Sequence, residues 1–285
     1  MPYGWEASGP VDWNTLVKYL NICRASLVER LAYRGDFLLG TLLRFLPVLT
    51  TILLWEAVFA GNGGKDVAGY TPRQMVAYLL LIHISRMFSS MPGLASGISR
   101  DVRDGNLKKY LLQPLDMLGY LLAYRAAHKF AYIVTSALPY ALLFLVCRSY
   151  FDGFPPWPTM LAYLASLLMS FLIGFYFEAM IGMAGFWLLE VSSLVWIVTT
   201  LNYMISGQMF PLELFQRDYP AVYAVLYCLP FKYLAAFPAT VFIGKAEGEE
   251  LWVNLLLQAV WVVVFAVLAR RLYAAGLRQY SAFGG

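Results

Sequence analysis

The densest group of reactive side chains in this sequence is a short charged segment. Six of the ten residues from Arg100 to Lys109 are charged, whereas charged residues make up 13% of the whole chain. Long apolar runs flank the segment on both sides, so it must reach water while its neighbours do not. A compact charged segment of this kind suggests a docking surface for a soluble partner, although an ordinary charged loop would have the same composition.

The charged segment is expected to form a short helix. Leu94, Ile98 and Val102 recur at i, i+4 and i+8, which places them in one apolar stripe that could insert into a groove on a partner. Gly105 is well placed to end this helix, and Pro114 opens the next one. Four charged side chains surround the stripe: Arg100, Asp101, Arg103 and Asp104.

Residues suited to catalysis or metal binding are few. The two histidines, His83 and His128, occur outside any His-Glu-x-x-His pattern, which does not favour a zinc enzyme. Cys23, Cys147 and Cys228 lack Cys-x-x-Cys spacing, so we interpret them as small buried hydrophobic residues. We expect no catalytic residue, metal or cofactor in this chain.

The composition indicates a membrane protein. Hydrophobic residues make up 60% of the chain and the mean hydropathy is +0.63, whereas the apolar share of soluble proteins is roughly 45–50%. Several runs reach the length of about 20 apolar residues that crosses a hydrocarbon core of about 30 Å. The sequence therefore predicts an all-α, multi-pass membrane protein, with the lipid bilayer and no nucleic acid among its partners.

A single membrane domain is expected over residues 37–285. Before it, within residues 1–36, apolar residues recur in steps of three or four, which predicts an amphipathic helix lying in the membrane interface. A cytosolic extension of the first span would fit that segment nearly as well. Six transmembrane helices are expected, at about 37–60, 72–91, 117–146, 159–180, 190–210 and 251–269.

Residues 211–250 decide the expected topology. Their apolar pieces are short and Pro230 and Pro238 interrupt them, which predicts a re-entrant or surface-lying hairpin on the extracellular side. With six spans and both termini inside, thirteen lysines and arginines lie on the inner side and six on the outer side, as the positive-inside rule expects. A seventh span would move the C-terminal arginines outside.

Two acidic residues fall within the expected spans. A carboxylate inside a span is costly and by default indicates a functional site. Glu178 lies far along the fourth span, and we favour the interpretation that it is already at the inner membrane interface. Glu56 lies near the outer end of the first span. Both stay candidates for an intramembrane polar site.

Four segments, taken together and in this order, resemble the type-2 ABC exporter permeases. The charged segment has the isoleucine, the acid–base pairs, the glycine, the leucines and the Pro-Leu of that family. The other three segments resemble the start of its second span, the end of its fifth span and its extracellular hairpin. The four are AGYTPRQMVAYLL (68–80), ISRDVRDGNLKKYLLQPLD (98–116), GQMFPLELF (207–215) and LPFKYLAAFPATVFIGK (229–245).

The resemblance implies a half-transporter that works with a second permease chain, identical or related, and with ATP-binding subunits. The charged segment would be the cytoplasmic coupling helix between spans 2 and 3, and Arg100, Asp101, Arg103 and Asp104 would contact the ATPase while Gly105 sets the turn. Glu190, in the hairpin between spans 4 and 5, is a candidate second cytoplasmic contact. The implied activity is export of an amphipathic drug, lipid or glycan across a bacterial inner membrane, with both termini cytoplasmic.

The chain has no phosphate loop of its own. Two Gly-Lys pairs end at Lys65 and Lys245, but Phe59 and Ala239 occupy the position of the first glycine in G-x-x-x-x-G-K-[ST]. ATP and Mg²⁺ are therefore expected on the partner ATPase. An ion-gradient-driven secondary transporter and a membrane-embedded enzyme are the alternatives. The first would need charged residues at the centre of the spans and the second a convergent set of polar residues, and the sequence favours neither.

Overall fold

The computed structural model describes residues 45–112, 116–188 and 190–280, together with Val17, Asn21 and Leu43. The regular structure of these residues is helical, and they form no strand apart from an isolated bridge between Val67 and Tyr70. The all-α fold class is therefore confirmed. The amphipathic helix expected within residues 1–36 and the start of the first expected span lie outside the described residues.

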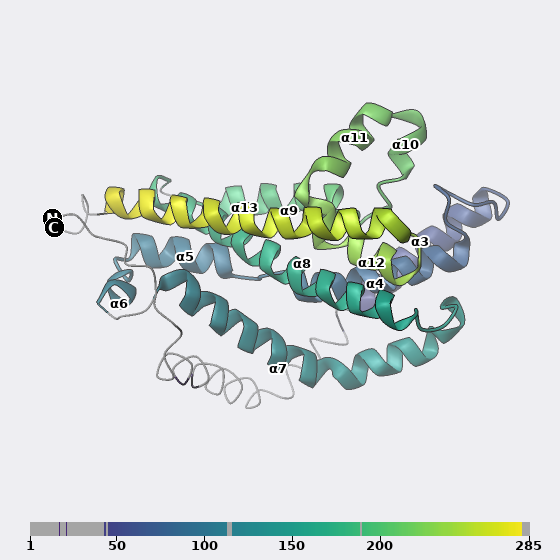
Figure 1. Cartoon of the computed structure of the whole chain (residues 1–285), viewed down its shortest axis with the longest axis horizontal. Coiled ribbons are helices and arrows are strands. Elements are labelled where there is room, and N and C mark those ends of the chain that lie inside the picture. The colour runs from purple at the N-terminus through teal and green to yellow at the C-terminus, as the bar shows by residue number, and fades with distance from the viewer. Residues whose placement is uncertain are drawn as a thin grey trace. The chain divides into compact units, whose positions relative to one another are not determined.

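The chain divides into two compact units, which are described separately. One comprises Met1–Leu43 and Tyr110–Leu142, and the other comprises Arg44–Lys109 and Leu143–Gly285. We call them the small unit and the large unit. Figure 1 shows their helices along the chain.

The described part of the small unit consists mainly of one helix. α7 (Met117–Val146) supplies it, with Pro139 in its interior and its last four residues in the large unit. Asp116 begins the helix, because its Oδ2 accepts a hydrogen bond of 2.9 Å from the backbone N–H of Gly119. Farther along, the rings of Tyr124 and His128 stack with centroids 6.4 Å apart.

The large unit holds the remaining helices. In chain order they are α3 (Phe45–Gly61), α4 (Pro72–Ser89), α5 (Leu94–Arg103), α6 (Lys108–Leu111, which straddles the two units), η1 (Arg148–Tyr150), α8 (Trp157–Met183), η2 (Ala184–Phe186), α9 (Ser192–Ile205), α10 (Leu214–Asp218), α11 (Pro220–Cys228), η3 (Pro230–Leu234), α12 (Ala236–Phe242) and α13 (Gly248–Tyr280).

Four helical segments are long and apolar enough to cross a membrane. They are Pro72–Arg103, Met117–Val146, Trp157–Phe186 and Gly248–Tyr280, among the described residues. α3 and α9 are apolar but shorter, with 17 and 14 residues. The chain is thus a multi-pass membrane protein, and four of the six expected spans meet the length of a crossing helix. Between residues 211 and 247 the chain folds into short helices, none of which reaches that length.

α4 begins where its sequence provides a helix start. Thr71 is the N-cap, and its side chain accepts a hydrogen bond from the backbone N–H of Gln74 while the Gln74 side chain accepts one from the Thr71 N–H. Pro72 follows at the first helical position, where a missing N–H has no cost. This double cap fixes the entry of the chain into α4.

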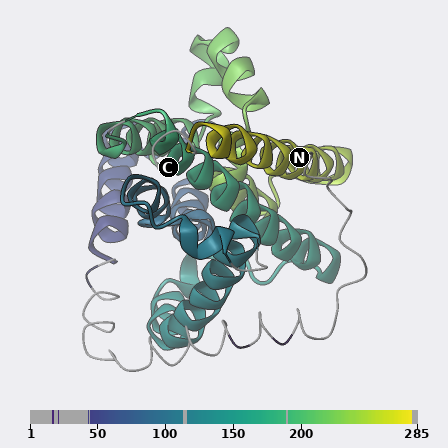
Figure 2. The same ribbon diagram turned by 90° about the vertical axis from the view of Figure 1, so that its left-hand side faces the viewer.

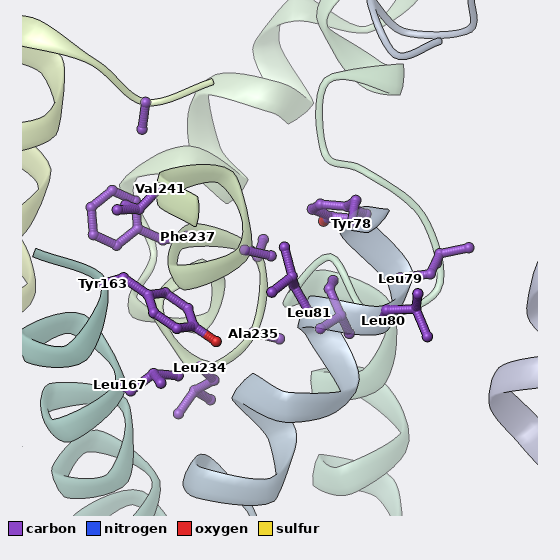
Figure 3. Close-up of a cluster of buried hydrophobic side chains, with 14 of the residues drawn as sticks. Tyr78, Leu79, Leu80, Leu81, Tyr163, Leu167, Leu234, Ala235, Phe237 and Val241 are labelled. Atoms are coloured by element: carbon purple, nitrogen blue, oxygen red, sulfur yellow. The ribbon is translucent and has the colours of Figure 1, made fainter. Parts of the chain in front are cut away.

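The core of the large unit forms where α4, α8 and the η3–α12 segment meet. Tyr163 and Leu167 of α8 lie against Leu234 and Phe237, beside the buried run of α4 from Tyr78 to Leu81 (Figure 3). All of these side chains are less than a tenth exposed. α12 is therefore packed inside the bundle, although it is only seven residues long.

A polar network crosses this core. Gln258 of α13 is fully buried, and its Nε2 donates hydrogen bonds to the Ser166 carbonyl oxygen at 2.9 Å and to Ser170 Oγ at 3.2 Å. Ser166 Oγ donates to Gln258 Oε1 at 2.9 Å, and Ser170 Oγ donates to the Tyr233 carbonyl oxygen at 2.6 Å. These bonds tie α8, α13 and η3 together, and polar side chains are used in this way between transmembrane helices.

Three helices of the large unit, α4, α8 and α13, run in a common direction. The Arg73 guanidinium, at the start of α4, lies 3.2 Å from the Asp152 carboxylate just before α8. At the opposite ends of α8 and α13, Phe186 contacts Gly276. Leu251 at the start of α13 and Thr159 at the start of α8 line one cavity. α4, α8 and α13 therefore all begin at one end of the large unit, and α8 and α13 finish together at the other.

α10 and α11 project from the rest of the large unit and form what we call the arm (Figures 1 and 2). Neither helix contains a buried residue. The arm lies toward the end where α4, α8 and α13 begin, which we call the arm end. α5 lies at the other end, which we call the α5 end.

Candidate functional site

The apolar stripe of α5 is buried within the chain itself. Leu94, Ile98 and Val102 are at most 8% exposed, and Ala95 and Ser99 between them are buried as well. α5 packs along the C-terminal part of α8 and on η2. The face of α5 that remains available to another molecule is consequently its charged face. The apolar stripe holds α5 on α8 and η2, and we call this buried contact the seat of α5.

Two glycines of the α8–η2 segment allow α5 to approach closely. A Cβ added at Gly182 would lie 2.7 Å from the Ala95 carbonyl oxygen and 2.9 Å from Ile98 Cβ. A Cβ added at Gly185 would lie 2.7 Å from Ser99 Oγ. A third close contact, between Gly174 and the Ser89 carbonyl oxygen, holds the end of α4. Small residues at such positions bring helix backbones together, so α5 and α8 are packed tightly against each other.

The charged residues of α5 lie on its outer side. Arg100, Arg103 and Asp104 are exposed. Asp101 is half-buried and its Oδ2 accepts a hydrogen bond of 2.7 Å from Lys109 Nζ. The structure thus gathers the four charged residues predicted for partner contact on one short helix, where three present their side chains to solvent and the fourth forms an internal ion pair.

Gly105 ends α5 with a Schellman turn. It adopts φ +72°, the left-handed region that favours glycine. Its N–H donates to the Val102 carbonyl oxygen at 3.4 Å, and the N–H of Asn106 donates to the Asp101 carbonyl oxygen at 2.9 Å. Leu107, which follows, is completely buried and anchors the turn. The glycine therefore sets the turn that reverses the chain after the charged face.

The structure also brings the turn before α9 next to α5. Val191 is 2% exposed and packs in one apolar cluster with Ala95 of α5 and Ile181 of α8. Glu190, which precedes it, is exposed. The candidate second contact therefore lies close to the first, on the same end of the large unit.

The end of α13 completes the base of this surface, which sequence reasoning missed. Phe186 of η2 contacts Gly276, and its ring lies 6.2 Å from that of Tyr280 in a T-shaped arrangement. The Tyr280 hydroxyl lies 3.8 Å from the position of a Cβ on Gly105. The signal in the sequence was Gly276, a glycine inside the long helix α13. A Cβ at this position would clash with the facing ring of Phe186. We call the exposed charged face of α5 with Glu190 the coupling surface.

The two acidic residues considered for an intramembrane site lie apart. Glu178 of α8 is half-buried and interacts electrostatically with Arg86 of α4, whose guanidinium donates a hydrogen bond of 3.4 Å to Ser89 Oγ. Arg86 is one turn from the end of α4, so this pair of opposite charges lies toward the α5 end. Glu56 is exposed on α3, near that helix's C-terminal end. The structure does not combine Glu56 and Glu178 into one site.

A second polar group, which sequence reasoning also missed, lies at the arm end. Lys232 is 3% exposed, and its Nζ donates a hydrogen bond of 2.8 Å to Asn254 Oδ1 while lying 3.0 Å from the centroid of the Tyr227 ring. The Tyr227 hydroxyl donates to Glu250 Oε1 at 2.8 Å. Burial lowers the pKa of Lys232 to about 8. The sequence signal was a spacing of four between Glu250, Asn254 and Gln258, which places a polar row on an otherwise apolar helix.

The sequence over residues 45–284 matches the family described as ABC-2 family transporter protein. This match covers the chain from α3 onward, including α5 and the arm. The chain belongs to the ABC-2 transporter family. No curated protein matches it.

Membership agrees with the type-2 permease resemblance of the four sequence segments and identifies an ABC transporter permease of the membrane. Permeases of the ABC-2 family normally work with ATP-binding subunits and serve as the transport subunit without an ATPase site of their own. Among the described residues no group of three or more His, Cys, Asp or Glu side chains could hold a metal ion.

Proposed function

We propose that this chain is the membrane subunit of an ATP-driven exporter. In this proposal it pairs with a second permease chain, and each permease receives an ATP-binding subunit on its coupling surface. The observation that carries the proposal is the division of α5 into two faces. Its apolar face is buried against α8 and η2, and Arg100, Arg103 and Asp104 are exposed on the other side. A helix seated so firmly, with a charged outer face, suits the transmission of force from a partner.

The coupling pathway follows from the contacts of α5. A displacement of α5 by the closing ATPase would be passed to α8, because a hard contact at Gly182 leaves no room for sliding. α8 in turn is bonded to α13 and η3 through Gln258 and Ser166. Movement at the coupling surface would thereby reach the arm end of the bundle. ATP and Mg²⁺ would be bound and consumed on the partner subunit.

The membrane orientation belongs to the same proposal. We place the α5 end and both termini in the cytoplasm of a bacterial cell, the arm end outside, and six spans in the inner membrane. The excess of Lys and Arg on the proposed inner side supports this orientation. The cargo class that goes with the proposal is an amphipathic molecule, whether drug, lipid or glycan.

Charge reversal on the coupling surface tests the proposed function. The variant carries Arg100→Glu together with Asp104→Lys, and the chain is co-purified with its ATP-binding subunit. We expect loss of most of the co-purified ATPase and of the ATPase activity that the permease stimulates, because both side chains are exposed and the buried seat of α5 is unchanged.

The matched control reverses a similar pair on the arm, Arg217→Glu with Asp218→Lys, and both of these residues are exposed too. The control should bind the ATPase like the unmodified chain. Unchanged association and ATPase activity in the α5 variant would contradict the proposal.

A further inference from the structure

A cavity of about 360 Å³ lies at the base of the arm. It falls within the range of roughly 300–1,000 Å³ that is typical of small-molecule pockets. Most of its lining is polar, and the side chains that matter here are Glu213, Gln216, Tyr223, Lys232, Lys245 and Glu250. They come from the arm, from the segment before it, from η3, from the turn between α12 and α13, and from the start of α13. We call this cavity the arm pocket, and neither the coupling surface nor the proposed force transmission uses it.

The cation positions of the arm pocket are already occupied by the chain. Lys232 Nζ lies over the Tyr227 ring, at 3.0 Å from its centroid, and donates to Asn254. Lys245 Nζ lies 3.9 Å from the centroid of the Tyr70 ring and donates to the Gly69 carbonyl oxygen at 2.6 Å. An aromatic face attracts one cation at short range. A cationic ligand would therefore be repelled by two ammonium groups that belong to the lining of the same cavity.

An anionic ligand is disfavoured by the same reasoning. Glu213 and Glu250 line the pocket beside the two lysines, so positive and negative side chains are balanced in number. Glu213 is half-buried, and burial raises the pKa of its carboxyl above the ordinary value. A second negative charge would increase the cost of keeping these carboxylates ionised, so the pocket suits a ligand without net charge.

We propose that the arm pocket binds a neutral, hydroxyl-rich ring, that is, a sugar unit. Each hydroxyl of such a ring donates one hydrogen bond and accepts others. The lining offers carboxylate acceptors at Glu213 and Glu250, ammonium donors at Lys232 and Lys245, and both functions at Gln216. The Tyr223 ring, 5.4 Å from that of Tyr227, adds an aromatic surface for the apolar face of the ring.

The binding experiment uses the full chain, purified and placed in lipid nanodiscs free of glycoside detergent, whose headgroup would compete. Methyl glucoside and N-acetylglucosamine are titrated against it by calorimetry. Glucuronate, choline and glycine betaine serve as anionic, cationic and zwitterionic probes. We expect saturable binding of at least one neutral sugar in the millimolar range, and at least tenfold weaker binding of the three charged probes.

Two pairs of variants locate the binding. Tyr223→Ala removes the aromatic surface and Glu250→Gln weakens an acceptor, and each should weaken sugar binding several-fold. Tyr219→Ala and Glu249→Gln are the matched controls, because both residues are exposed and neighbouring but do not line the pocket. Both controls should bind like the unmodified chain. Thermal unfolding of each variant verifies that it is folded.

Three results would overturn the proposal. They are no saturable sugar binding, a preference for glucuronate, choline or betaine, and equal losses in the pocket variants and in their controls. The measurement needs no ATPase, so its failure leaves the proposed coupling function untouched, and a failure of the coupling test leaves sugar binding measurable.

Discussion

At the scale of single residues, Lys232 is the one lysine or arginine that is less than a tenth exposed among the residues that the structure describes. Its ammonium is buried. It is stabilised by a hydrogen bond to Asn254, by the rings of Tyr227 and Tyr233, and by the negative charge of Glu250. A lysine in such surroundings costs free energy when charged, which is why its pKa falls to about 8 from an ordinary value of 10.5. The cost of burying this charge agrees with a role for Lys232 in the arm pocket, whose lining it forms.

The lowered pKa of Lys232 predicts how stability depends on pH. Between pH 8 and 10 the unfolded chain holds the Lys232 proton more tightly than the folded chain does, so the free energy of unfolding rises with pH over that window. The contribution is at most about 3 kcal/mol for a shift of this size. We expect the thermal unfolding midpoint in nanodiscs to increase from pH 8 to 9.5 through this group.

Lys232→Met removes that contribution, and its midpoint should rise less over the same window. Lys65→Met, at an exposed lysine in the loop after α3, is the control and should keep the slope of the unmodified chain. Identical slopes for the unmodified chain and Lys232→Met would show that the lysine is not strained by burial.

At the scale of elements, the packing of α5 on α8 decides whether the coupling surface can transmit force. The contact is made by backbone and short side chains, and a glycine at 182 is required because a Cβ there would meet the Ala95 carbonyl oxygen and Cα at 2.7 and 2.9 Å. The neighbour is backbone of a helix, which cannot turn away as a flexible side chain could. The seat of α5 therefore tolerates little added volume.

Gly182→Ala should loosen this seat. Overpacking of this kind costs typically about 1–3 kcal/mol, so we expect a lower unfolding midpoint and weaker stimulation of the partner ATPase, measured by thermal unfolding and by phosphate release. Gly97→Ala in α5 itself is the matched control. A Cβ at Gly97 meets nothing within 4 Å, and alanine favours a helix by roughly 0.5–1 kcal/mol over glycine.

The control should therefore be as stable as the unmodified chain or slightly more stable. A Gly182→Ala protein with unchanged stability and coupling would show that α5 moves independently of α8.

The sequence predicted what lies within a single helix and missed what lies between helices. The apolar stripe Leu94, Ile98 and Val102 and the terminating Gly105 could be read from spacing and from the conformational freedom of glycine. The buried seat of α5 could not, since the contact of Gly182 with Ala95 joins residues far apart in the chain. For the same reason the spacing predicted that the charged residues lie around one short helix, while the burial of the stripe against the chain's own α8 was not foreseen.

The polar row on α13 illustrates the same limit. Asn254 and Gln258 carry no charge, so a search for charged residues inside spans passed over them. Their meaning depends on the partners they meet, Lys232 in one case and Ser166 in the other, and both partners come from other segments. Long-range pairing of this kind depends on tertiary packing, and the periodicity of residues along a single helix does not reveal it.

At the scale of the whole molecule, the direction of the long helices constrains the number of crossings. α8 and α13 begin together at the arm end and finish together at the α5 end. The chain must therefore return to the arm end between them. α9 begins beside α5 and, with 14 residues, covers about 21 Å of that return. The end of α9 then meets the start of α12, where the Ala236 N–H donates to the Ser206 carbonyl oxygen. This return is the reason why we propose that α9 crosses the membrane despite its short length.

Labelling from the two faces of the membrane tests this topology. Asp104→Cys and Gln216→Cys are introduced separately into a chain whose natural cysteines are replaced by serine, and both positions are exposed, one at the α5 end and one on the arm. With an impermeant maleimide, right-side-out vesicles should label only Gln216→Cys and inverted vesicles only Asp104→Cys, because α4, α8 and α13 separate the two ends by at least one crossing. Ser166→Cys, fully buried among helices, should react from neither side.

Reaction of Gln216→Cys from the cytosolic side alone would put the arm inside the cell. It would also reverse the orientation on which the coupling role of α5 depends, because the ATPase could not reach α5 from the cytosol.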